Sequence, residues 1–212
     1  MSFGLKTVVG LVGLLGLAVP SLVLADGSTP VNATAVIYAA GTEGSVASSA
    51  GGTVPVGISV SGDSSITFSA TGGISLNNGT GSNFNPPDGV GAAVGSSSET
   101  GSGSISGITA PNAGYLVGVF LAAGGPSGPA PTALDFGSTS FPSLSPGLDQ
   151  VFFIGDGLTG DGTGATQLFN IPTGATELFL GISDACGYNG GPSCYSDYVG
   201  TFDVTSDLLT YP

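Results

Sequence analysis

The amino-acid sequence predicts an all-β protein, an antiparallel β-sandwich or jelly roll, from three observations. Short apolar runs recur along the chain after residue 25. The 39 glycines and 14 prolines fall largely between these runs, where both residue types favour turns. No window of about a dozen residues in this part of the chain has the apolar spacing of a helix.

The first predicted strands lie in the N-terminal third of the chain. Residues 34–39 form a short apolar segment that predicts one strand. Residues 53–60 and 64–69 alternate apolar with small polar side chains, which predicts two more. Because Gly62 and Asp63 stand between them, we expect these two strands to pair as a β-hairpin.

The later predicted strands are more apolar. Residues 115–121 and 151–154 are almost continuously apolar, which is typical of buried strands. Three further segments complete the set: residues 167–171, 177–182 and 199–205.

Two long connections separate these strands. Residues 89–107 consist mostly of Gly, Ser and Ala and predict a flexible loop. Residues 124–146 are rich in proline and predict an ordered, extended excursion. No internal repeat and no second domain is evident, so we expect residues 26–212 to form one β-sandwich domain with long Gly/Ser-rich and Pro-rich loops.

Residues 1–25 have the features of a secretory signal peptide. Lys6 precedes the apolar run of residues 8–24, and Val23-Leu24-Ala25 ends it as a small-residue cleavage motif. We therefore expect a secreted, extracellular protein at a cell surface or in a matrix. In an exported chain, two cysteines are more typical of a disulfide than of a metal or redox pair, so Cys186 and Cys194 are predicted to be bonded.

The charge balance excludes several classes of function. Lys6 is the only basic side chain and there is no His, whereas all 14 acidic residues follow position 25. Phosphate backbones need Lys or Arg for neutralisation, so nucleic-acid binding is excluded, and acidic membranes would repel the exported chain. Catalysis through His or a Lys Schiff base is impossible, and we expect no enzyme, a two-carboxylate glycoside hydrolase being the least favoured class. Bound cations are the natural counter-charge for clusters of these acids.

Residues 179–205 concentrate the candidate functional groups. Two predicted strands flank a loop that holds Asp184, Asp197 and both cysteines. Ca²⁺ takes about 6–8 oxygen ligands, and carboxylates and carbonyls converging from one loop supply them. The sequence therefore predicts a calcium site, with an acidic surface loop tied by a disulfide as the alternative.

A second candidate ion site lies in the glycine-rich residues 155–166. This segment offers Asp156 and Asp161 but lacks the ligand spacing of an EF-hand loop. We regard it as the weaker of the two candidates.

Four segments resemble the galactophilic calcium lectins of the PA-IL (LecA) type, and more closely related domains in secreted bacterial proteins, many of which carry a PEP-CTERM anchor. The segments are YLVGVFL at 115–121, FNIP at 169–172, ELFLGISD at 177–184 and YSDYVGTF at 195–202. The resemblance implies a galactose-binding-domain-like β-sandwich that holds one calcium ion, with sugar hydroxyls completing its coordination. Residues 124–146 are an insertion relative to the lectins. No such anchor follows Asp207, so we expect release from the cell or retention by other means.

The resemblance also implies roles for individual residues. Asp184 would bind calcium and contact sugar, and Asp197 would be the first of two adjacent side-chain ligands, also contacting sugar. Cys194 and Leu76 would supply backbone carbonyls. Tyr198 stands where the second amide or carboxylate is expected, and a tyrosine hydroxyl is a poor calcium ligand, so we expect Tyr198 to contact sugar or to pack beside the disulfide.

Asn85 and Asp88 match a second sugar-contacting loop of the lectins, although Asn85-Pro86-Pro87-Asp88-Gly89 is also typical of a turn. The resulting hypothesis is a secreted, calcium-dependent carbohydrate-binding protein whose partner is an extracellular glycan or polysaccharide. The alternative is a structural subunit of an extracellular matrix or filament, favoured by the 7% content of charged residues and the abundance of glycine. Homo-oligomers are compatible with both.

Overall fold

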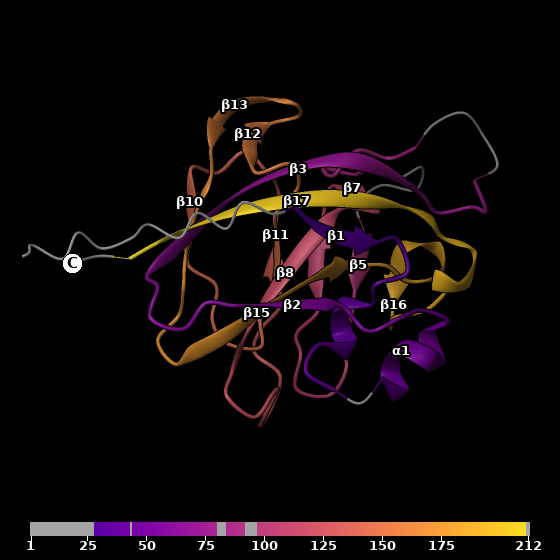
Figure 1. Cartoon of the computed structure of the whole chain (residues 1–212). Helices are drawn as coiled ribbons and strands as arrows, with labels where there is room; N and C mark the ends of the chain where they lie inside the picture. The colour runs from indigo at the N-terminus through magenta and orange to yellow at the C-terminus, as the bar shows by residue number, and fades with distance from the viewer. Residues whose placement is uncertain (1–27, 43, 80–83, 92–96, 211–212) are drawn as a thin grey trace, which may run out of the picture.

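Alternating buried and exposed side chains build the first of the two β-sheets that form the sandwich (Figure 1). The computed structural model describes residues 28–42, 44–79, 84–91 and 97–210, so the proposed signal peptide lies outside the described residues. The first sheet has the strand order β1 (Thr29–Asn32), β17 (Val199–Leu209), β3 (Ser65–Ser75), β14 (Leu168–Asn170) and β10 (Ser143–Leu144). In β17, Phe202 and Val204 are buried whereas Asp203 between them is exposed.

The second sheet contains the most apolar strands. Its order is β11 (Val151–Phe153), β8 (Leu116–Ala122), β15 (Ala175–Ile182) and β2 (Val56–Ser59), all antiparallel. Every residue of β8 from Leu116 to Leu121 is buried, as expected for a central strand covered on both faces. Gly118 is required there, because a Cβ would lie 2.7 Å from the ring of Phe152.

Aromatic rings from both sheets meet in the core. Phe169 of the first sheet packs against Phe152 of the second with a ring-centroid distance of 5.4 Å. Phe68 lies 5.2 Å from Phe169, and Phe120 lies 5.1 Å from Phe152. Each fully buried Phe contributes about 1.5–3 kcal/mol through the hydrophobic effect. The predicted all-β sandwich is therefore confirmed.

Smaller elements surround the sandwich. A four-stranded sheet contains β16 (Asn189–Gly190), β5 (Ser97–Glu99), β6 (Ile108–Ala110) and β9 (Leu134–Asp135), and two strand pairs are β12 (Leu158–Gly160) with β13 (Thr163–Thr166) and β4 (Val90–Gly91) with β7 (Asn112–Ala113). The helices are short: η1 (Ile37–Ala39), α1 (Ser45–Ala50), η2 (Cys186–Tyr188) and η3 (Tyr195–Asp197). Among the described residues, none of the helices has the length and apolar character needed to cross a membrane.

The strand predicted at residues 34–39 is wrong. Only Ala35 and Val36 form isolated bridges, and the chain then turns into η1, where Ala40 N–H donates to the Ile37 carbonyl. All six residues except Thr34 are buried, and apolar character alone does not distinguish a buried strand from a buried turn. The first strand of the described residues is instead β1.

The hairpin predicted around Gly62 is also wrong. β2 pairs with β15 in the second sheet, whereas β3 pairs with β17 over eleven residues in the first. The Gly62 turn, with φ of 91°, therefore carries the chain from one sheet to the other. The long partner β17 offers far more backbone hydrogen bonds than a short hairpin would, and this favours the crossing.

Of the two long connections, one has the predicted structure and the other does not. Residues 124–146 are ordered and extended, as predicted, and contribute β9 and β10. Residues 89–107 are not one flexible loop, because β5 pairs with β6 and buries Ser97 and Glu99; residues 92–96 lie outside the described part of the chain. The six-residue helix α1 was not expected from the sequence.

Candidate functional site

The loop between β15 and β17 has both ends tied together. The predicted disulfide is present between Cys186 and Cys194, with a Cα–Cα distance of 5.3 Å, and both cysteines are exposed. Asp184 precedes the bridge and Asp197 follows it. The bridge therefore holds the two carboxylate-bearing ends of the loop near one another.

The structure gathers the four residues assigned to the calcium ion, and Tyr198 assigned to sugar contact or packing, around one cavity of about 240 Å³. Asp184, Asp197, Cys194 and Tyr198 come from the loop between β15 and β17, and Leu76 follows β3. The rest of the wall is formed by Ala185, Cys186, Gly187 and Tyr188. Two segments more than a hundred residues apart in sequence thus meet at this cavity, which we call the Asp184 cavity.

Asp184 is the most unusual group in this cavity. Its residue is only 1% exposed, and neither carboxylate oxygen accepts a hydrogen bond of normal geometry from the described residues, although the Ala185 amide is close enough to influence the group. Burial raises the pKa of Asp184 from 3.8 to about 8; the Ala185 amide opposes this shift, and the negative charges of Glu99 and Asp197 add to it. A buried carboxylate without donors is destabilising unless a proton or a cation neutralises it.

Asp197 connects the loop to the neighbouring segment. Its side chain is half-buried, and its backbone carbonyl accepts a 2.6 Å hydrogen bond from the Asn78 amide. This bond fixes the loop against the residues that follow β3, including Leu76. It therefore explains why the two cavity-lining segments stay together.

Tyr198 is chiefly a packing residue. It is 7% exposed, and its ring lies 5.3 Å from the ring of Tyr195. Because Tyr198 also lines the Asp184 cavity, its side chain occupies the place where the resemblance predicts a second amide or carboxylate ligand.

A buried acid that the sequence did not reveal lies near Asp184. Glu99 accepts hydrogen bonds from the hydroxyls of Ser183 (3.0 Å) and Tyr115 (3.3 Å), which bond in turn to Tyr38 and Ser97. Its Oε1 atom is buried, with no partner in the described part of the chain. Burial raises the pKa of Glu99 to about 7, although the bonds from Ser183 and Tyr115 lower it. The one signal in the sequence was that Glu99 is the only charged residue of segment 89–107.

Asp88 does not line the Asp184 cavity. Its Oδ1 accepts a 3.3 Å bond from the Asp156 amide, and its buried Oδ2 has no partner among the residues described. Burial, and then the negative charges of Asp156 and Asp161, raise the pKa of Asp88 to about 7. Asp88 and Asp156 therefore form a separate acidic pair at the start of the β12–β13 hairpin.

Asn85 has a structural role in the same region. Its backbone pairs with Ile74 in both directions, at 2.7 and 3.1 Å, and its side-chain amide donates to the Ala113 carbonyl at 3.4 Å. Like Asp88, it lies outside the wall of the Asp184 cavity.

The two acidic residues of the weaker candidate ion site, Asp156 and Asp161, have different surroundings. The Asp156 carboxylate accepts bonds from the amides of Leu158 (2.8 Å) and Gly162 (2.7 Å), so it caps the hairpin turn, and Asp161 is exposed. Within residues 28–42, 44–79, 84–91 and 97–210, no three His, Cys, Asp or Glu side chains gather to hold a metal. Any ion at the Asp184 cavity would therefore need backbone carbonyls in addition to its two carboxylates.

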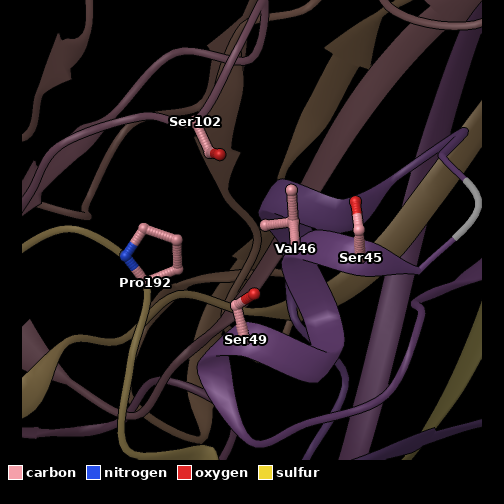
Figure 2. A pocket seen from close by; sticks show the side chains of 5 residues that line it. All are labelled: Ser45, Val46, Ser49, Ser102 and Pro192. Carbon is pink, nitrogen blue, oxygen red and sulfur yellow. The ribbon is translucent and has the colours of Figure 1, made fainter.

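A further cavity of about 340 Å³ lies beside α1 (Figure 2). Ser45, Val46 and Ser49 of α1 line one side, with Ser102 and Pro192 across from them. Among the described residues, no charged side chain lines this cavity.

Comparison of the chain with protein-family models, with curated proteins and with solved structures gave no match. The geometry of the Asp184 cavity and the four quoted sequence segments are therefore the basis for any functional proposal.

Removing the disulfide is expected to lower stability and to loosen the Asp184 cavity. A Cys186→Ser/Cys194→Ser variant should lose about 2–3 kcal/mol in the chain-entropy model, a drop in melting temperature of about 5 °C or more. Thermal melts with and without reductant measure this effect, and the double variant serves as the control because reductant should not change its melt. Identical melts of the oxidised and reduced wild type would contradict the prediction.

Proposed function

We propose that the Asp184 cavity binds one Ca²⁺ ion and, through it, the hydroxyl groups of an extracellular glycan. The observation that carries this proposal is the buried Asp184 carboxylate, which lacks a donor among the described residues. Apart from Lys6 the chain has no basic side chain to neutralise it. A hard cation would supply the missing charge, and carboxylate oxygens are the ligands that such cations prefer.

The residues around the cavity suit calcium better than other metals. Asp184 and Asp197 would supply carboxylate oxygens, and Cys194 and Leu76 would supply backbone carbonyls. The Cys194 sulfur is bonded to Cys186 and is not a thiolate, so soft metals have no thiolate ligand here. Since Ca²⁺ takes about 6–8 oxygens, this set leaves positions for water or sugar hydroxyls.

The proposed activity is binding without catalysis, by a secreted protein. A bound calcium ion would polarise and orient the hydroxyls of a sugar, while Tyr198 at the cavity wall offers an aromatic surface. Asp184 and Asp197 would act as ion and sugar ligands together. The sugar contacts implied for Asn85 and Asp88 stay a prediction of the resemblance, because neither residue lines the cavity.

A glycan array tests this function directly. We expect the exported form to bind a subset of galactose-containing or related glycans in millimolar calcium and to lose that binding in EDTA. An Asp184→Asn variant, which keeps the shape of the side chain, should bind no glycan in either buffer. Glycan binding that is equal in calcium and EDTA would contradict the proposal.

The alternative is a structural subunit of an extracellular matrix or filament, favoured by the 7% content of charged residues. In that case calcium would stabilise the protein or promote its assembly without any glycan bound. Sedimentation velocity with and without calcium separates the two functions, because only the alternative predicts open-ended assembly in the absence of glycan, whereas a closed homo-oligomer is compatible with both.

Tyr198→Asn is expected to strengthen calcium binding while weakening the fold. The amide would restore the second side-chain ligand implied by the resemblance, and we expect calcium affinity to rise by about tenfold. Loss of the ring that packs on Tyr195 should cost about 2–4 kcal/mol in EDTA. Calorimetric titration and melts in EDTA measure the two effects. Tyr198→Phe, which keeps the ring, is the control and should not gain affinity.

A further inference from the structure

The Tyr195 hydroxyl forms hydrogen bonds with the main chain of the two residues that flank Ser183. It donates to the Ile182 carbonyl and accepts from the Asp184 amide, each at 2.9 Å. Tyr195 is 0% exposed, so water does not compete for these two bonds. Ile182 is the last residue of β15, and the two bonds therefore fix the direction in which the chain leaves the strand.

These bonds also join the two ends of the disulfide-closed loop. Tyr195 directly follows Cys194, and Asp184 lies two residues before Cys186. The disulfide ties the loop at its exposed side, whereas the Tyr195 hydroxyl ties it at its buried side. Close packing holds the base of the Tyr195 side chain, since a Cβ on Gly52 would lie 3.0 Å from the Tyr195 Cβ.

We propose that Tyr195 positions Asp184 for the cation, an inference that rests on the proposed calcium function. Since no described residue hydrogen-bonds the Asp184 carboxylate, its placement depends on its own backbone. Tyr195 holds the amide of that backbone. The hydroxyl donates to one main-chain group and accepts from another, and Tyr195 does not line the Asp184 cavity, so Tyr195 is a positioning residue and not a calcium ligand.

Tyr195→Phe and Tyr115→Phe form a matched pair for the test. Each variant removes one fully buried hydroxyl that has polar partners, but the partners of Tyr115 are side chains, among them Ser97 and Glu99, and not the Asp184 main chain. Calorimetric titration with calcium is done below the melting temperature of both variants. The calcium affinity of Tyr195→Phe should be at least about tenfold weaker than that of the wild type, as for other groups that orient metal ligands. Tyr115→Phe should stay within about twofold of wild type, whereas both variants should melt earlier in EDTA. Wild-type affinity in Tyr195→Phe would overturn the proposal.

Amide hydrogen exchange of the wild-type protein gives a second test that needs no variant. By linkage, calcium should slow exchange of the Asp184 amide if the Tyr195 bond and the ion support one another. Calcium that binds without slowing this exchange would overturn the positioning role and leave the calcium function standing. A wild-type protein that binds no calcium would overturn the proposed function itself, and this inference with it.

Discussion

Replacing Asp184 by Asn is expected to raise the melting temperature of the calcium-free protein at pH 8 and to abolish its response to calcium. The wild-type carboxylate is buried without donors among the described residues, and its pKa is raised to about 8. Since each pKa unit corresponds to about 1.4 kcal/mol, an uncharged side chain removes a cost of several kcal/mol. Part of this gain is lost because Asn buries an amide at the same place.

We expect a net gain of about 2 kcal/mol in EDTA, or about 5 °C. Saturating calcium should stabilise the wild type by about 3 kcal/mol at a hundredfold excess over Kd, and the variant not at all. Asp203→Asn is the control, because it removes the same charge from an exposed position on β17. It should leave both the EDTA melt and the calcium response unchanged. A destabilised Asp184→Asn variant that still responds to calcium would contradict the expectation.

Acidification is expected to stabilise the calcium-free protein. The folded-state pKa values of Asp88, Glu99 and Asp184 are raised to about 7, 7 and 8, above ordinary values of 3.8 to 4.5. The folded protein therefore keeps protons that the unfolded chain releases. The stabilisation is complete below about pH 4 and is lost as the pH rises through 7 to 8.

Between about pH 4 and the folded-state pKa of 7 to 8, each of these protons changes the free energy of unfolding by about 1.4 kcal/mol per pH unit. We expect the calcium-free protein to lose at least about 2 kcal/mol between pH 5 and pH 7.5. Calcium should reverse part of this slope, because a bound ion favours the ionised form of its ligands and acid expels the ion. Parallel melts across this range, in EDTA and in calcium, measure both slopes. Equal slopes in the two buffers would mean that no carboxylate in the protein acts as a calcium ligand.

The strands that the sequence predicted well are those whose apolar runs are long and central. Residues 115–121 and 177–182 became β8 and β15, which pair through the middle of the second sheet. The Gly62 hairpin failed because local turn chemistry does not show that β17, far along the chain, is the better partner for β3. The fold class follows from composition and periodicity, but strand pairing depends on contacts distant in sequence.

The candidate site shows the same division. Asp184, Asp197 and Cys194 lie within one loop, so their proximity was predictable, and Leu76 followed from the resemblance alone. Glu99 was not predictable, because being the single acid of a Gly/Ser-rich segment does not show that it is buried beside Ser183. The position of Asp88 beside Asp156 likewise depends on how distant loops pack.

A calorimetric calcium titration of residues 26–212, after removal of metal with EDTA, is the most direct test of the proposed site. We expect one ion to bind per protein, with proton release that grows as the pH falls below 8, and no binding to Asp184→Asn. Absence of binding by the wild type, or equal binding by Asp184→Asn, would contradict a calcium site at Asp184.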